Sequence, residues 1–191
     1  MQKKNKIIIV SGASGSGKTT LVNHLLACSE LNLFFSVSAC TRTKRQLEKN
    51  GKHYHFLSQS EFKEKIMLNE FLEWEEVYPG HFYGTLRSTI VSVLNSGKNI
   101  LFDVDVKGAQ KLKKHFQDQA ISIFVQAPSL SVAKERLTLR GTDLGKELKM
   151  RLEKTKKEIK IGQFMDHQLL NNKLNKTKKD IYNLVASFLN S

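Results

Sequence analysis

A glycine-rich segment near the N-terminus constrains this chain more than any other part of its sequence. Residues 12–19 match the pattern G-x-x-x-x-G-K-[ST], with Lys18 and Thr19 in the last two positions. An apolar run over residues 6–10 precedes the segment, and apolar residues at helical spacing follow it over residues 20–28. Because a strand, a glycine-rich loop and a helix follow one another in this order, the segment indicates a phosphate-binding P-loop.

Each residue type in this loop has a chemical use. Glycines let backbone N–H groups converge on phosphate oxygens beside a helix N-terminus, which favours negative charge. Lys18 is then expected to reach the β- and γ-phosphates of a bound nucleotide, and the hydroxyl of Thr19 to bind Mg²⁺. The alternative is a glycine-rich turn that binds nothing, but such a turn has no use for a Gly-Lys-Thr ending. The residues expected to bind the nucleotide here are Gly12, Ala13, Ser14, Gly15, Ser16, Gly17, Lys18, Thr19 and Thr20.

The length and composition favour one domain. A chain of 191 residues can bury a full hydrophobic core. The sequence contains no stretch that approaches the length of a membrane span. Its two cysteines, Cys28 and Cys40, lack metal-ligand spacing and a multi-cysteine framework. We therefore expect a cytoplasmic protein with two free thiols, without zinc, a disulfide or a membrane partner.

The formal net charge of +13 raises the question of a nucleic-acid partner. Much of the excess is lysine in the last third of the chain, where lysines alternate with glutamates between residues 146 and 160. This helical pattern is typical of a solvated helix face. The sequence has no nucleic-acid-binding signature, and a positive field would also gather anionic nucleotides. We therefore do not expect RNA or DNA as a partner.

Strands and helices alternate along the rest of the chain. Strands are expected over residues 33–39, 51–57, 71–78, 99–105, 120–127 and 167–172, and helices over residues 60–68, 86–94, 129–139, 144–164 and 176–189. The alternation predicts an α/β fold of three layers with a mostly parallel sheet. Short β segments are concentrated in residues 38–85, which indicates an insertion over the strand ends. Within it, we expect Ser60 to cap a helix whose inward residues include Phe62, Ile66 and Met67.

Two pairs of polar residues have the chemistry of a substrate site. Arg42 and Arg45 lie three apart beside hydroxyl groups, and a guanidinium fork can bond two oxygens of a phosphate monoester. A solvated basic loop is the alternative, which the local sequence alone favours. Asp103 and Asp105 end a buried strand, where a carboxylate can hold Mg²⁺ or its waters. For Asp105 a helix cap remains an open alternative.

With these segments in place, the sequence resembles guanylate kinase, a family of nucleoside monophosphate kinases, over nearly its whole length. The motifs that carry the resemblance occur in the family's order: residues 12–19; Ser38 with Thr41, Arg42 and Arg45; Gly51 with Tyr54; Glu73 and Trp74; Tyr83, Gly84 and Thr85; Asp103, Val104 and Asp105 with Gly108; and Arg136, Arg140, Gly141 and Arg151. Apart from the P-loop, each motif is weak alone. Their joint order is hard to obtain by chance.

The resemblance implies a role for most of these residues. The phosphate of GMP would be held by Arg42, Arg45, Tyr54 and Tyr83. The guanine would be read by Ser38, Glu73, Thr85 and Asp103. A carboxylate at position 73 can accept hydrogen bonds from the N1–H and 2-amino groups of guanine. Adenine lacks that pair of donors and would leave the buried carboxylate unpaired, which gives strong discrimination.

The resemblance also implies a division of the chain into three parts. The core would comprise residues 1–37, 86–135 and 166–191, the GMP-binding insertion residues 38–85, and a helical lid residues 136–165. In the lid, Arg136 would contact ATP, while Arg140 and Arg151 would stabilise charge on the transferring phosphoryl group. The implied catalytic residues are Lys18, Arg45, Arg140 and Arg151.

The expected reaction is phosphoryl transfer from ATP to GMP, and also to dGMP, giving ADP and a guanine nucleoside diphosphate. Mg²⁺ would assist, and no covalent intermediate on a side chain is needed. We expect GMP and ATP as small-molecule partners and either a monomer or a homodimer. Two alternatives stay open: a non-catalytic guanylate-kinase-like module that binds proteins, which usually lacks the P-loop, and a P-loop kinase for another small acceptor.

Overall fold

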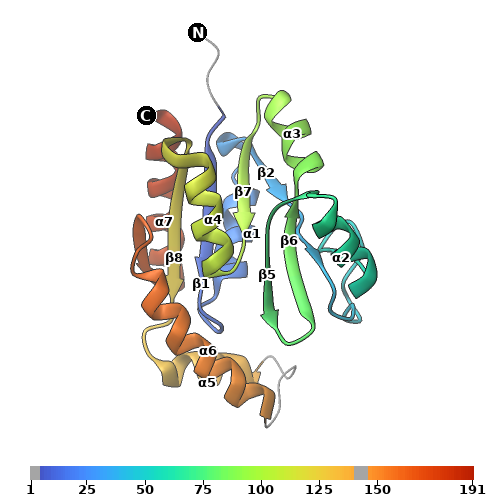
Figure 1. Ribbon diagram of the computed structural model, residues 1–191. Coiled ribbons are helices and arrows are strands. Elements are labelled where there is room, and N and C mark those ends of the chain that lie inside the picture. Colours follow the sequence, from blue (N-terminus) through green and yellow to red (C-terminus); the bar gives the residue numbers. More distant parts are fainter. Residues whose placement is uncertain (1–4, 140–145) are drawn as a thin grey trace.

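The computed structural model describes residues 5–139 and 146–191, and in these residues five parallel strands form the central sheet (Figure 1). In sheet order they are β2 (Leu33–Ser36), β7 (Asn99–Asp103), β1 (Ile7–Gly12), β8 (Ala120–Gln126) and β9 (His167–Leu170). Every neighbouring pair is parallel. The expected α/β fold with a mostly parallel sheet is therefore confirmed.

Helices cover both faces of this sheet, because its central strand β1 carries apolar side chains on both faces. Along β1, Ile7 and Ile9 pack in one hydrophobic cluster, and Ile8 and Val10 pack in the other. The first cluster lies under α3 (Arg87–Asn95) and α4 (Val106–Phe116), and the second under α1 (Lys18–Ala27) and α7 (Leu174–Asn190). These four side chains are fully buried, so this part of β1 is apolar on both faces instead of alternating between apolar and polar residues.

A second sheet lies beside the first and carries the remaining strands of the described chain (Figure 1). In sheet order they are β4 (His55–Phe56), β3 (Ala39–Cys40), β6 (His81–Leu86) and β5 (Phe71–Tyr78). Helix α2 (Gln59–Met67) packs against it through Phe62, whose ring stacks on Phe71 at 4.3 Å. Strands β5 and β6 form a long antiparallel hairpin, which Figure 1 shows extending toward the lower end of the central sheet.

The remaining elements close the lower end of the molecule and join the others. Helices α5 (Leu130–Leu139) and α6 (Lys146–Gly162) lie together below the end of β1, facing the tip of the β5–β6 hairpin (Figure 1). The last residue of α6 must be small, because a Cβ at Gly162 would lie 2.5 Å from the ring of Phe124. Two short 3₁₀ helices, η1 (Ser29–Leu31) and η2 (Gln117–Gln119), are the remaining elements of the residues that the structure describes.

Most predicted elements are present, but several predictions are wrong in detail. The strand predicted over residues 33–39 is divided between the two sheets. The strand predicted over residues 51–57 is reduced to β4, since residues 51–53 form a turn. Helix α4 has no predicted counterpart, although Asp105 was considered as a helix cap. Met67 is 79% exposed, so it does not face inward.

The N-cap of α2 is also not the predicted one. The hydroxyl of Ser58 accepts a hydrogen bond from the N–H of Glu61, and the Glu61 carboxylate accepts one from the N–H of Ser58. These two bonds form a capping box, which satisfies two backbone donors that the helix itself cannot pair. Ser60 instead lies within the first turn.

This assignment predicts a difference between two neighbouring serines. Ser58→Ala should lower the free energy of unfolding by about 1 kcal/mol, because it removes the cap. The matched control Ser60→Ala should change it by less than about 0.5 kcal/mol, as an ordinary surface substitution does. Urea denaturation of both variants measures the difference. A larger loss for Ser60→Ala than for Ser58→Ala would contradict the assignment.

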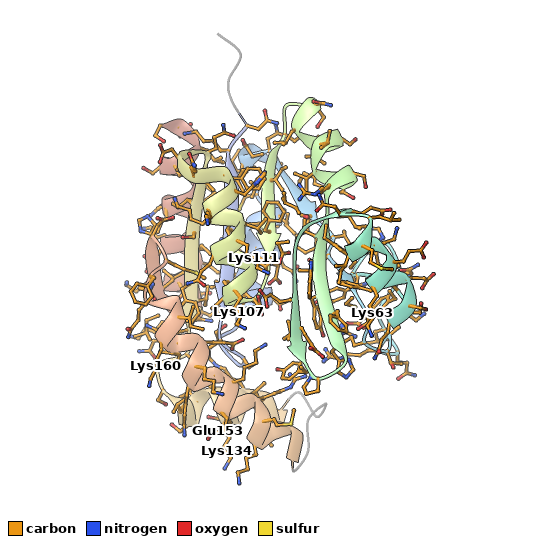
Figure 2. All side chains as sticks on the ribbon, in the orientation of Figure 1. Lys63, Lys107, Lys111, Lys134, Glu153 and Lys160 are labelled. Carbon is orange, nitrogen blue, oxygen red and sulfur yellow. The ribbon has the colours of Figure 1, made fainter. Side chains whose placement is uncertain are left out.

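The excess positive charge is distributed over several helices. Figure 2 labels Lys63 on α2, Lys107 and Lys111 on α4, Lys134 on α5 and Lys160 on α6. These lysines therefore do not form a single stripe. In the part of the chain that the structure covers, none of the helices has the length and apolar character needed to cross a bilayer.

Candidate active site

The P-loop has the backbone geometry that phosphate binding requires. Gly15 and Gly17 have φ angles of +78° and +84°, a conformation that residues with a Cβ rarely adopt. Space also requires glycine here, because a Cβ at Gly15 would lie 2.5 Å from the carbonyl oxygen of Ala133. Gly17 is the N-cap of α1, and no described side chain caps that end. The first N–H groups of α1 therefore stay available for an anion.

A polar cavity of about 220 Å³ joins this loop to the second sheet. The P-loop residues 12–19 form one wall. The rest of the lining includes Ser38, Tyr54, Glu73, Glu75, Tyr78, Tyr83, Asp103, Asp105, Lys154 and Glu158. The cavity therefore brings together two groups of predicted residues that are far apart in the sequence.

Lys18 and the two aspartates form the floor of the cavity. The Nζ atom of Lys18 forms an ion pair with the carboxylate of Asp103 and donates to the carbonyl oxygen of Val104 at 3.1 Å. Asp105 instead caps α4, since its Oδ1 accepts a hydrogen bond from the N–H of Gly108 at 2.8 Å. The helix-cap alternative for Asp105 is thus confirmed, although this residue also lines the cavity.

Glu73 is a buried carboxylate on β5 that faces the cavity. It is 6% exposed, and its Oε1 accepts a hydrogen bond from the hydroxyl of Thr85 at 2.7 Å. Its other oxygen lies so close to α4 that a Cβ at Gly108 would be 2.7 Å from it. Burial, reinforced by the charge of Asp105 and opposed by the bond from Thr85, raises the pKa of Glu73 to about 7. This carboxyl group therefore changes its charge near neutral pH.

Two phenols lie next to one another further along the second sheet. The rings of Tyr54 and Tyr83 meet edge to face, with centroids 6.0 Å apart. Burial raises the pKa of each to about 12. Both hydroxyls therefore stay protonated at physiological pH and can donate hydrogen bonds to an anion.

The two predicted phosphate-binding arginines have different environments. The guanidinium of Arg42 lies 4.8 Å from the ring centroid of Tyr54 and pairs with both carboxylate oxygens of Glu48, at 2.7 Å and 2.5 Å. The bonds from Arg42, and from the N–H of Arg45, lower the pKa of Glu48 to about 2. The side chain of Arg45 is exposed, whereas that of Arg42 is partly buried, and the described lining of the cavity includes neither arginine.

Glu48 is a residue that the sequence analysis missed. The loop from Arg42 to Glu48 is held closed by this carboxylate, which also accepts the Arg45 N–H at 2.8 Å. An acid six residues after Arg42 in an otherwise basic loop was the available signal. Thr85, by contrast, was predicted, and it lies beneath Glu73 and not on the cavity wall.

The predicted lid arginines are placed as follows. Arg136 on α5 donates to the carbonyl oxygens of Ser16 and Asn171, at 3.4 Å and 3.1 Å. Arg151 on α6 lies 5.9 Å from the ring centroid of Tyr78. Arg140 lies outside the described residues. Thr20 follows the loop on α1 and is exposed, so its predicted contact with ATP stays a prediction.

The lysine-glutamate pattern of α6 is not a wholly solvated face, which corrects the prediction. Glu158 is 6% exposed, and its Oε2 accepts a hydrogen bond from the P-loop N–H of Ser14 at 3.4 Å. Lys154 lies one turn before it and also lines the cavity. Lys154 and Glu158 follow Arg151 by three and seven residues, which places all three side chains on one face of the helix. This spacing was the available signal that they lie on the same side as Arg151.

The parallel sheet, the P-loop at the end of its central strand and the adjoining polar cavity define a P-loop nucleotide-binding protein of the α/β class. The family model for guanylate kinase matches residues 4–188, and the chain belongs to the guanylate kinase family. The residues of the second sheet that line the cavity lie within the part of the chain that this family model matches.

Similarity to individual guanylate kinases supports this membership. The guanylate kinase of Porphyromonas gingivalis is 44% identical over 184 residues, which cover 96% of this chain and 98% of that protein. The guanylate kinase of Bacteroides thetaiotaomicron is 42% identical over 189 residues, covering 99% and 92%. The crystal structure of guanylate kinase from Anaplasma phagocytophilum superposes with a TM-score of 0.79 at 28% identity, covering 97% of this chain and 87% of that one.

Proposed function

We propose that this chain transfers the γ-phosphoryl group of ATP to GMP or dGMP, as an enzyme of purine nucleotide metabolism. The observation that carries the proposal is the buried carboxylate of Glu73, which faces the same cavity as the P-loop and accepts a hydrogen bond from Thr85 behind it. One wall can hold a triphosphate, and the other offers a carboxylate that suits guanine. The relatives from Porphyromonas gingivalis and Bacteroides thetaiotaomicron described above, to which this chain is similar, are named guanylate kinases.

The ATP half of the site is the P-loop with its neighbours on α5. The N–H groups at the start of α1 and the ammonium group of Lys18 bind the phosphates. The buried atoms Ser16 Oγ and Asn171 Oδ1, which lack partners among the described residues, lie beside this loop and support a ligand there. Arg136 is already fixed against the loop and stays close to the nucleotide.

The GMP half lies on the second sheet, and we assign residues 38–85 to an acceptor-binding insertion. Glu73 accepts from the N1–H and 2-amino groups of guanine and Ser38 supplies a hydroxyl, while the hydroxyl of Thr85 holds the Glu73 carboxylate in place. Tyr54, Tyr83, Arg42 and Arg45 hold the phosphate of GMP. Because Arg45 is exposed, its side chain must turn toward the cavity when the acceptor binds.

The oxygen donors of the cavity fit Mg²⁺. The described residues contain no group of three or more histidine, cysteine, aspartate or glutamate side chains that could hold a metal alone. Asp103 and Asp105 line the same cavity as the P-loop, and Thr19 offers a hydroxyl as the second residue of α1. Mg²⁺ binds typically through one or two carboxylates together with substrate phosphates. When bound, it neutralises charge on the β- and γ-phosphates; we assign Thr19 and Asp103 to it, the latter through water.

The transfer itself is a direct displacement. An oxygen of the GMP phosphate forms the new bond to the γ-phosphorus, while the bond from that phosphorus to the bridging oxygen of ADP breaks. Both substrates are anions, so Lys18 and the lid arginines Arg140 and Arg151 reduce their repulsion and stabilise the transition state. We propose residues 136–165 as a lid whose closure excludes water, and the remaining residues as the core.

The pKa of Glu73 predicts how the reaction depends on pH. With its pKa raised to about 7, Glu73 is ionised above that pH and protonated below it. Guanine binds to the ionised form of Glu73, so kcat/KM for GMP should reach its maximum above about pH 8. It should fall by up to about tenfold for each unit below pH 7. Initial rates at low GMP between pH 6 and pH 8 measure the effect.

The matched control for this profile is Glu73→Gln. The phosphate of GMP itself takes up a proton near pH 6, and this effect persists in the variant. The parent should therefore show a steeper fall than Glu73→Gln. Parallel profiles in the two proteins would contradict the role of Glu73.

Product identification tests the proposed function. The purified chain, given ATP, Mg²⁺ and GMP, should form ADP and GDP in equal amounts, as chromatography measures. A chain that forms no GDP but binds a phosphopeptide would instead be the protein-binding module. We also propose a cytoplasmic location, which the free thiols of Cys28 and Cys40 support.

A further inference from the structure

Helix α6 carries a lysine that touches the second sheet. The Nζ atom of Lys154 lies 4.6 Å from the ring centroid of Tyr78, within the range of a cation–π interaction. Tyr78 is the last residue of β5, the strand that also carries Glu73. The side chain of Lys154 is 21% exposed, so the contact is largely shielded from water. A change in the position of α6 therefore alters this contact at the end of β5.

The same lysine is linked to the P-loop through Glu158. Its Nζ lies 3.4 Å from Glu158 Oε1, and Glu158 Oε2 accepts from the N–H of Ser14. Burial raises the pKa of Glu158, and the positive charge of Lys154 opposes that shift. A buried carboxylate beside a phosphate-binding loop requires a cation, and Lys154 provides one.

Tyr78 is in turn part of a hairpin tip that hydrogen bonds hold in shape. The carboxylate of Glu76 accepts from the N–H of Gly80 at 2.7 Å, and Gln59 donates to the carbonyl oxygen of Gly80 at 3.0 Å. The ring therefore moves together with the second sheet. Figure 1 shows this tip facing α6.

We propose that Lys154 is a positioning residue that couples the two substrates. The proposal rests on the proposed function, since it assigns ATP to the P-loop and GMP to the second sheet. The phosphates of ATP accept the hydrogen bond of the Ser14 N–H and repel the Glu158 carboxylate, so that Lys154 remains as the partner of this carboxylate. The ion pair of Lys154 and Glu158 then becomes closer. It holds α6 in one position and thereby also fixes the contact between Lys154 and Tyr78. ATP thereby tightens GMP binding, and GMP tightens ATP binding by the same factor.

Four single variants separate this role from a purely structural one. Lys154→Met removes the charge and keeps the chain length, whereas Lys154→Arg keeps the charge. Tyr78→Leu removes the ring, whereas Tyr78→Phe keeps it. Calorimetric titration of each protein with GMP, in the presence and absence of a non-hydrolysable ATP analogue and Mg²⁺, gives the factor by which the analogue tightens GMP binding.

We expect the factor to fall by about fivefold in Lys154→Met and in Tyr78→Leu, which corresponds to the loss of one shielded cation–π contact. Lys154→Arg and Tyr78→Phe should keep the factor of the parent. The double variant Lys154→Met/Tyr78→Leu should lose no more than Tyr78→Leu alone, because Tyr78→Leu already removes the contact with Lys154 together with that of Arg151. Because Lys154→Met leaves the buried Glu158 without this cation, its melting temperature should fall, and the factor is therefore compared at a temperature at which the parent and all variants are folded.

Several results would overturn the proposal. One is an unchanged factor in Lys154→Met; another is a loss of affinity for the analogue alone with the factor intact, which would make Lys154 a simple phosphate ligand. A parent without any coupling would also overturn it. These outcomes differ from failure of the proposed function, which is a parent that forms no GDP from ATP and GMP.

Discussion

Lys18→Ala is expected to lower kcat by about 10²- to 10³-fold with every acceptor tested. The reason is that Lys18 acts on the phosphates of ATP and therefore on the part of the reaction that all acceptors share. In the free protein its ammonium group is held at the end of β7 by Asp103 and by the carbonyl oxygen of Val104. This places the charge on the cavity floor before the nucleotide arrives, so little reorganisation is needed. A coupled assay of ADP formation measures the loss.

A surface lysine provides the control for this prediction. Lys63→Ala on α2 also removes one positive charge, but from an exposed helix outside the cavity. It should leave kcat unchanged. Because Lys18→Ala leaves Asp103 without this cation, the melting temperature of both variants must be recorded. Turnover by a folded Lys18→Ala variant equal to that of the parent would refute the role of Lys18.

Glu73→Gln should lower kcat/KM for GMP by about 100-fold and leave the slow reaction with AMP nearly unchanged. The amide keeps the size of the side chain but replaces an acceptor oxygen with a donor. If Oε1 keeps its bond to Thr85, the NH₂ group faces the N1–H and 2-amino donors of guanine, and donors then oppose donors. The selectivity for GMP over AMP is therefore expected to collapse while the transfer chemistry survives.

Glu75→Gln is the matched control on the same strand. Glu75 also lines the cavity, but its carboxylate pairs with Lys111 on α4 at 2.7 Å. Its replacement should leave the ratio of the GMP and AMP rates close to that of the parent. The account of guanine reading fails if Glu73→Gln keeps the parental ratio.

The elements that sequence predicted well are those with a local physical cause. The P-loop follows from glycine conformation and from the apolar run before it, and β1 and α1 lie where these signals placed them. Strand ends were harder to predict. The apolar run 33–39 has no local break, yet β2 pairs with β7 and β3 pairs with β6. Which strand a segment pairs with is a property of the whole fold and not of the segment.

The candidate site was predictable only in part, for the same reason. The pairing of Arg42 with Glu48 and the approach of Glu158 to the P-loop depend on distances across the folded chain. Alternating charges on α6 are equally compatible with a solvated helix and with one that contacts the cavity. The family resemblance predicts that Glu73 reads guanine, but the burial and the raised pKa of this carboxyl group come from the packing of β5 against α4.

The most direct test of the central claim is a comparison of acceptors under one set of conditions. ADP formation from ATP and Mg²⁺ should be followed in parallel with GMP, dGMP, AMP, CMP and UMP, each below saturation. The site predicts that kcat/KM for GMP exceeds that for AMP by at least about 10²-fold, because only guanine presents two donors to Glu73. A higher kcat/KM with AMP than with GMP would contradict the assignment.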